Sequence, residues 1–123
     1  MWAKGLFSTE AAVELLIGHG WWLCREDFLE IAVEFGWEIA DGVVLAAVDW
    51  DAAVAALEAN GLPCSGGEGR ILRLAASIAG GVAVDLGSAL SGLDERNVAE
   101  VARAVLHAAG HRDMRVAVAG ERW

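Results

Sequence analysis

Residues 65–81, SGGEGRILRLAASIAGG, are the stretch that decides the fold. Ser65 followed three residues later by Glu68 matches a capping box, in which each side chain accepts a hydrogen bond from the other residue's backbone N–H. Apolar residues then recur at helical spacing until two consecutive glycines favour a helix end. The stretch therefore predicts a well-bounded central helix whose apolar face comprises Ile71, Leu72, Ala75 and Ile78.

Toward the C-terminus, two aspartates stand where helices are expected to begin. Asp85 follows an extended segment and is expected to cap a short helix over residues 86–90. Asp94 is expected to cap a last helix that ends at Gly110. The apolar residues of that helix are Val98, Val101, Ala102, Val105 and Leu106. Residues 115–119 are expected to form a strand or to fray.

Toward the N-terminus, three more helices are expected. Asp49 is a cap for a helix over residues 50–60, which stops at Gly61. A second helix is expected over residues 22–35, with its stop at Gly36. A first helix is expected over residues 9–17.

The first helix has its own start and stop signals. Ser8 is its expected cap, and Glu10 in the first turn suits the helix dipole. The expected apolar stripe is Val13, Leu16 and Ile17. Gly18 and Gly20 then end the helix.

Residues 37–48 fit two structures. An Asp41-Gly42 turn between apolar segments favours a short β-hairpin, although the alanines would also tolerate a helix. With the hairpin favoured, the chain is expected to be mainly α, a bundle of about five helices in a single domain over residues 1–123.

Composition restricts the class of protein. The 24 alanines favour helix. A chain of 123 residues can bury one hydrophobic core without stabilisation by disulfides or a metal ion. The longest uncharged run, residues 74–84, is too short to cross a hydrocarbon layer of about 30 Å as a helix.

Cys24 and Cys64 lie forty residues apart, which predicts two free thiols. With no signal-peptide pattern at the start, a cytoplasmic protein is expected.

Charge is unevenly distributed along the chain. Residues 1–64 contain 11 acidic and 2 basic side chains, whereas residues 65–123 contain 7 of each. An acidic half disfavours nucleic acid, because phosphate binding depends on Lys and Arg. It suits a basic surface of a protein partner, although acidity also serves solubility. The apolar composition additionally permits a homo-oligomer.

The acidic half has a regular pattern of its own, and on the expected helix its glutamates form one edge. They recur every four residues, as Glu26, Glu30, Glu34 and Glu38. Like charges at this spacing destabilise a helix. The edge is a candidate contact surface for a partner, and it is equally a candidate for a face that is simply exposed to solvent. Trp21 and Trp22 precede it, and tryptophan is enriched at interface hot spots. Adjacent side chains are expected to point apart, with at least one ring in the core.

Other chemistry has weaker support in the sequence. Ser65, Gly66, Gly67 and Arg70 form a glycine-rich helix start that could hold an anion, although the capping box explains the same residues and the Gly-Lys-Ser/Thr of a phosphate loop is absent.

Both cysteines are candidates for a lowered thiol pKa. Cys64 precedes a helix N-terminus and Cys24 precedes Arg25, which makes a cysteine-dependent enzyme an alternative. His107 and His111 are separated by a helix end and lack a third ligand, so no metal is expected, and no cofactor or catalytic residue is assigned.

The C-terminal half also resembles a helix-turn-helix in outline. A turn at residues 91–93 separates two expected helices, and Arg96 and Asn97 could read bases. Asp94 and Glu95 would face the phosphates, which argues against DNA. A DNA-binding regulator using residues 86–109 remains an alternative.

Three segments resemble small uncharacterised proteins of actinobacteria and their mobile elements. They are residues 67–81 (GEGRILRLAASIAGG), 92–97 (GLDERN) and 107–110 (HAAG). The resemblance covers roughly the C-terminal half and implies no known activity or residue role. The sequence as a whole favours a non-enzymatic protein-interaction module, such as a regulator or inhibitor, that uses the acidic helix edge and the neighbouring tryptophans.

Overall fold

A computed structural model describes residues 2–39, 43–111 and 114, with side chains described for residues 7–34, 47–111 and 114. The fold is mainly helical with one two-stranded antiparallel hairpin, as predicted, and the described residues form six α-helices. In chain order the elements are α1 (Trp2–His19), η1 (Trp22–Cys24), α2 (Glu26–Ala32), β1 (Val33–Ile39), β2 (Val43–Val48), α3 (Trp50–Glu58), α4 (Gly66–Gly80), α5 (Leu86–Leu90) and α6 (Glu95–Ala108).

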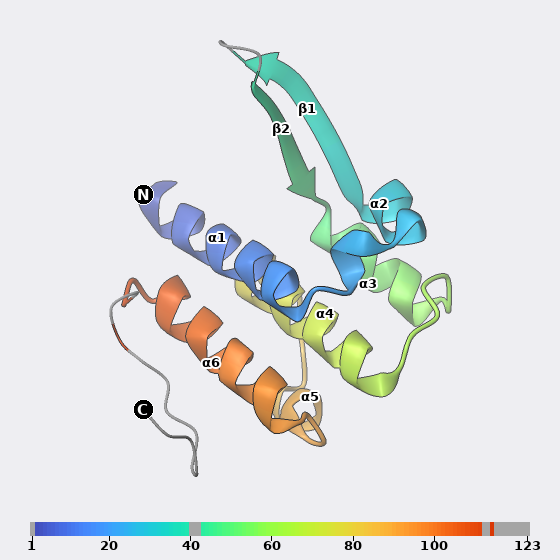
Figure 1. Cartoon of the computed structure of the whole chain (residues 1–123), viewed down its shortest axis with the longest axis vertical. Coiled ribbons are helices and arrows are strands. Elements are labelled where there is room, and N and C mark those ends of the chain that lie inside the picture. The colour runs from blue at the N-terminus through green and yellow to red at the C-terminus, as the bar shows by residue number, and fades with distance from the viewer. Residues whose placement is uncertain (1, 40–42, 112–113, 115–123) are drawn as a thin grey trace.

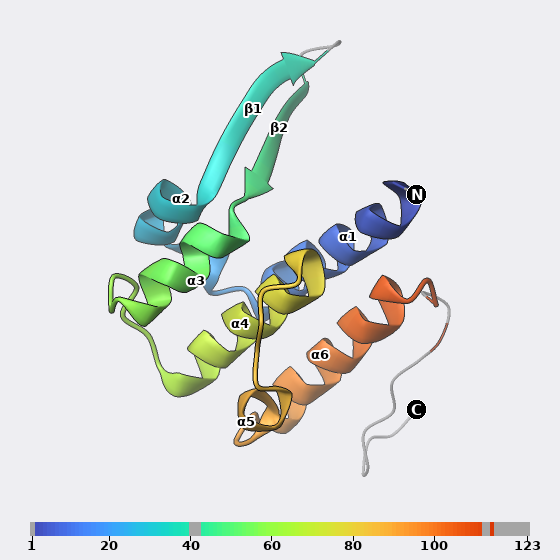
Figure 2. The same ribbon diagram turned by 180° about the vertical axis from the view of Figure 1, so that it is seen from behind.

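The elements form a helical body and a projecting arm. Helix α1 packs against both α4 and α6, and α3 packs on α4 (Figure 1). The β1–β2 hairpin extends away from these helices, and the view from behind shows the same projection (Figure 2). No helix in the described part of the chain is both long and apolar enough to cross a membrane.

For the helices that follow the hairpin in the chain, the predicted starts are confirmed. Each serine or aspartate that was assigned as a cap does cap its helix. The Ser65–Glu68 capping box is complete, with Ser65 N donating to Glu68 Oε1 at 2.8 Å and Glu68 N donating to Ser65 Oγ at 3.2 Å. The caps Asp49, Asp85 and Asp94 each accept from the backbone N–H three residues on. These signals are local, so they do not depend on the tertiary fold.

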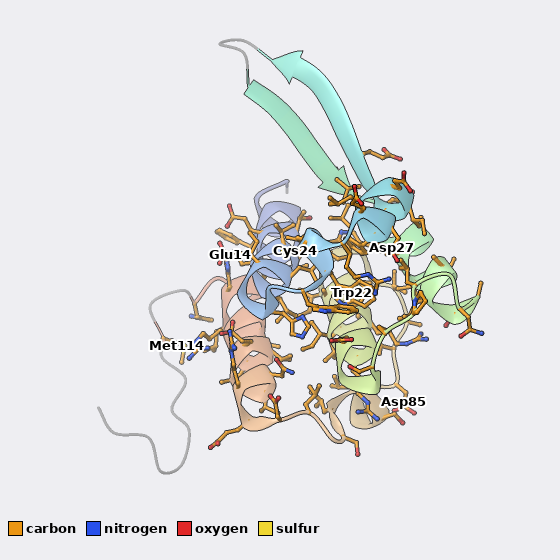
Figure 3. The ribbon with its side chains drawn as sticks, turned by 45° about the vertical axis from the view of Figure 1, so that its right-hand side comes forward. Glu14, Trp22, Cys24, Asp27, Asp85 and Met114 are labelled. Carbon is orange, nitrogen blue, oxygen red and sulfur yellow. The ribbon has the colours of Figure 1, made fainter. Side chains whose placement is uncertain are left out.

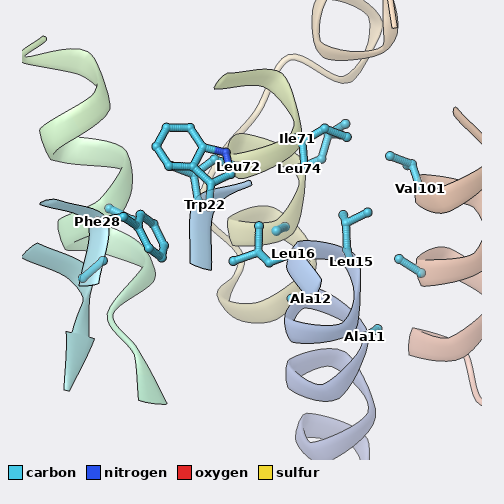
Figure 4. Close-up of a cluster of buried hydrophobic side chains, with 14 of the residues drawn as sticks. Ala11, Ala12, Leu15, Leu16, Trp22, Phe28, Ile71, Leu72, Leu74 and Val101 are labelled. Atoms are coloured by element: carbon cyan, nitrogen blue, oxygen red, sulfur yellow. The ribbon is translucent and has the colours of Figure 1, made fainter. Parts of the chain in front are cut away.

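The core lies where α1 meets α4, η1 and α6. Leu15 and Leu16 of α1 are buried together with Ile71 and Leu72 of α4, and Trp22 is fully buried beside them (Figure 4). Alanines supply much of the remaining interface, which lets the helices approach closely. The buried alanines of the core include Ala11, Ala12, Ala75 and Ala104.

Helix α1 differs from its prediction in both length and face. It begins at Trp2, so Ser8 lies within the helix and does not cap it. Its buried face is Ala11, Ala12, Leu15 and Leu16, whereas Ile17 is 60% exposed. Of the expected stripe, Leu16 is buried as predicted, but the prediction gave no weight to alanine, which is the residue that fits the close contacts with α4 and α6.

The predicted helix over residues 22–35 is correct only for Glu26–Ala32. A short 3-10 turn, η1, is followed by extended Arg25, and α2 ends at Ala32. Val33–Ile39 then form β1, so Gly36 is not a helix stop. The residues from Val33 to Trp37 include β-branched and aromatic side chains, which fit a strand and lose more rotamer freedom in a helix.

The hairpin was favoured over a helix and is confirmed, with strands that begin earlier than residue 37. Val33 pairs with Val48 and Ile39 pairs with Val43. The register shifts between Phe35 and Glu38, which marks an irregularity on β1. The expected Asp41-Gly42 turn and the expected strand at residues 115–119 lie outside the described residues.

Several apolar residues assigned to core faces are exposed. On α6 the buried residues are Ala99, Val101, Ala104 and His107, whereas Val98 and Val105 are 45% and 54% exposed. Val101 is buried as predicted, but Val98 and Val105 were assigned to the wrong face, because the buried face of α6 is completed by the alanines Ala99 and Ala104.

A glycine in the first turn of α4 and the glycine that caps its C-terminal end are expected to respond in different ways to alanine. Gly67 is helical and an added Cβ meets nothing within 4 Å, so Gly67→Ala should raise the free energy of unfolding by up to about 1 kcal/mol. Gly81 has φ +72°, so Gly81→Ala should lower it by about 1–2 kcal/mol. Urea unfolding of both variants checks this, and equal effects would contradict the positions given to these glycines.

Candidate functional site

The two adjacent tryptophans do not point apart. Trp22 is fully buried and its Nε1–H donates to the carbonyl oxygen of Glu68 at 2.9 Å. The ring of Trp21 packs edge-on against it, with centroids 4.8 Å apart and planes at 80°. Figure 3 shows Trp22 directed from η1 toward α4. Trp22 therefore serves the core, and of the pair only the half-buried Trp21 can touch a partner.

Arg25 holds the start of α2 in place. Its guanidinium lies 4.7 Å from the ring centroid of Trp21 and 5.2 Å from that of Trp22. The same group forms a two-point ion pair with Asp27 and donates to the carbonyl of Pro63. Hydrogen bonding from Arg25 lowers the pKa of the Asp27 carboxyl, and the pKa of Arg25 is raised in return. Arg25 thus links α2 to the segment before α4.

The four predicted glutamates do not lie along one helix. Glu26 and Glu30 are on α2, whereas Glu34 and Glu38 are on β1. The four-residue spacing is therefore not a helical edge beyond Ala32, and the prediction of a single column is wrong. Glu26, Glu30 and Glu34 are nevertheless exposed, on consecutive elements of the chain. The side chain of Glu38 lies outside the described part.

The structure shows more closely which part of the molecule contains the net negative charge. We define the acidic lobe as residues 26–60, which comprise α2, the hairpin and α3. The lobe contains nine carboxylates and no Lys, Arg or His, while the rest of the chain has nine acidic and nine basic residues. The entire net charge of −9 is thus the charge of this lobe.

The glycine-rich start of α4 borders a hollow of about 470 Å³. Cys64, Ser65, Gly66 and Arg70 are among its lining residues, and Gly67 is not. The Glu68 carboxylate accepts from Ser65 N and already supplies negative charge at this helix end. An anion site at Ser65, Gly66, Gly67 and Arg70 stays a prediction, with Glu68 opposing it.

Cys64 lacks the environment of a nucleophile. Partial burial raises the pKa of its thiol, and the nearby Glu68 carboxylate raises it further. The expectation that a position before a helix lowers this pKa is wrong, because burial and, after it, the Glu68 carboxylate outweigh the opposite effect of Arg25 and Arg73. Cys24 and Cys64 are both free, as predicted, and both are exposed. Cys24 Sγ contacts the carbonyl of Gly20 at 3.6 Å.

The candidate DNA-reading residues are partly engaged within the chain. Helices α5 and α6 form on either side of the expected turn. Arg96 donates to the carbonyl of Gly18 at the end of α1, at 3.4 Å. Asp94 caps α6 with its carboxylate, which keeps negative charge where phosphates would approach.

A group that sequence reasoning missed lies between the first and last helices. His107 is only 6% exposed, and its Nε2 lies 2.8 Å from Oε1 of Glu10. Its Nδ1 lies 3.2 Å from Oε1 of Glu14. The ring also faces Phe7, with centroids 6.4 Å apart. The only available signal was the i,i+4 spacing of the two glutamates, because the histidine is 97 residues from Glu10.

Comparison with known proteins gives no match, either to a family model, to a curated protein or to a solved structure.

The raised pKa of Cys64 predicts slow alkylation. In a Cys24→Ser background, the rate of iodoacetamide reaction should rise with a midpoint above the ordinary thiol pKa of about 8.5, since burial and Glu68 disfavour the thiolate. The pH–rate profile, with Cys64→Ser as the unreactive control, measures this midpoint. A midpoint near neutral pH would overturn the environment described for Cys64.

Proposed function

We propose that this chain is a non-enzymatic protein-interaction module that binds a basic surface of a partner protein through its acidic lobe. The observation that supports the proposal most is the segregation of the whole net charge into residues 26–60, which comprise α2, the projecting hairpin and α3, while the rest of the chain is charge-balanced (Figure 1). Complementary potentials of this kind steer association and select the partner.

Exposure of the carboxylates supports a role in contact. Glu30 and Glu34 are exposed and lie on the adjoining elements α2 and β1. Neither is needed to cap a helix, unlike Asp49, whose side chain accepts from Ala52 N. Charges without a structural role in the fold are available to a partner. Trp21, half-buried next to α2, adds an aromatic group at the edge of this surface.

The hairpin itself also suits a partner. Two strands alone are marginally stable in water, and a strand edge offers unpaired backbone groups. On β1 the register irregularity and the two glutamates discourage pairing with another strand. Strand β2, VVLAAV, contains no charged residue and no proline. Its first and last residues, Val43 and Val48, both pair with β1. An extended apolar segment flanked by basic residues would match it.

A second copy of the chain fits this surface poorly. Contact between two acidic lobes would bring nine carboxylates against nine more, without a basic side chain on either. Like charges placed across an interface are destabilising. The partner is therefore inferred to be a different, basic protein.

Charge reversal on the lobe tests the proposal. Wild type, Glu30→Lys and Glu34→Lys are used as baits in native-host lysate, and a retained protein is identified, purified and titrated directly. Each reversal should weaken its binding by about three- to tenfold at low salt, because attraction is replaced by repulsion, and added salt should weaken wild-type binding.

Glu95→Lys is the matched control, since Glu95 is exposed on α6 and the charge change is the same. It should leave binding within about twofold of wild type. Equal binding by all variants would contradict the proposal, as would a gel shift with duplex DNA that Arg96→Ala abolishes. A self-associating chain whose dissociation follows Glu34→Lys would also contradict it.

A further inference from the structure

We propose that His107, Glu10 and Glu14 form a binding site for one divalent transition-metal ion, such as Zn²⁺, between α6 and α1. The site lies apart from the acidic lobe, so it is independent of the partner surface proposed above.

The geometry brings three metal-binding side chains together. One ligand atom from each of Glu10, Glu14 and His107 lies within 4.8 Å of the others. Ligands of a four-coordinate ion at about 2.0–2.2 Å stand roughly 3.3 Å apart, so an ion would widen the 2.8 Å contact between His107 and Glu10 and draw the most distant ligand atoms together. Glu10 and Glu14 are one helical turn apart on α1 and therefore present their carboxylates on the same face.

Burial distinguishes this cluster from surface acids. The side chain of His107 is 7% exposed, and it is the buried polar residue among the described core positions. The two glutamate side chains are 40% and 52% exposed, so solvent and an ion reach the site from their side.

The donor types select the ion. Imidazole nitrogen with carboxylate oxygen suits Zn²⁺ and related transition metals, whereas Mg²⁺ and Ca²⁺ prefer oxygen ligands alone. Three protein ligands leave the remaining position to water.

The competing account is a purely ionic contact. A protonated His107 donates from both nitrogens, and this imidazolium between Glu10 and Glu14 would join the helices without metal. The ionic contact and the metal site differ in their expected binding of Zn²⁺, because only a metal site gives saturable binding that requires all three side chains.

The test is calorimetric titration of the full chain with Zn²⁺ in a Cys24→Ser/Cys64→Ser background, which removes both thiols as ligands. One ion should bind per chain, and the thermal midpoint should rise with Zn²⁺ concentration by mass action. Glu10→Gln and Glu14→Gln, which keep side-chain size, should each weaken binding at least tenfold.

His111→Ala is the matched control, because His111 is exposed beyond the end of α6. It should leave the affinity within about twofold. Circular dichroism must show that both glutamine variants remain folded, and His107→Gln supplies a third ligand deletion that should abolish binding. The site is disproved if wild type shows no saturable binding, if the glutamine variants bind as wild type does, or if His111→Ala removes binding.

Discussion

Burial of the Trp22 indole is the constraint on which the rest of the structure depends. The ring lies in the core with Phe28 and Leu72, and its N–H donates to the carbonyl of Glu68 (Figure 4). The same Glu68 closes the capping box of α4 through its side chain. One contact therefore fixes the start of η1 to the first turn of the central helix. It also sets where α2, and with it the acidic lobe, leaves the body.

This attachment explains how one small chain can combine two different surfaces. Outside residues 26–60 the chain is charge-balanced, and α1 packs against α4 and α6 through alanine and leucine. The lobe contains all the net charge and a hairpin with unpaired edges. Arg25, between the two, stacks on the tryptophans and holds Asp27. Because the lobe is attached to the body in this way, its surface keeps its orientation when it binds a partner. The conformational entropy lost on binding is therefore smaller.

The features that the sequence could predict are the local ones. Four caps, from Asp49 to Asp94, depend on residues three positions apart and were found where expected. The helix over residues 22–35 was not, because Val33 begins a strand whose pairing with Val48 is set by the tertiary fold. The acidic surface was predicted in the right part of the chain but with a helical geometry that the strand removes. The His107 cluster joins residues nearly a whole chain apart, so no local pattern indicates it.

Native-state hydrogen exchange tests the central claim, that Trp22 joins lobe and body into one cooperative unit. Amides of α3 and α4 should exchange with the same opening free energy in wild type. In Trp22→Phe, which loses the hydrogen bond to Glu68, that shared value should fall by about 1–3 kcal/mol for both helices together. The account is contradicted if α3 exchanges in a separate, easier opening in wild type, or if Trp22→Phe lowers the protection of α3 while α4 keeps its own.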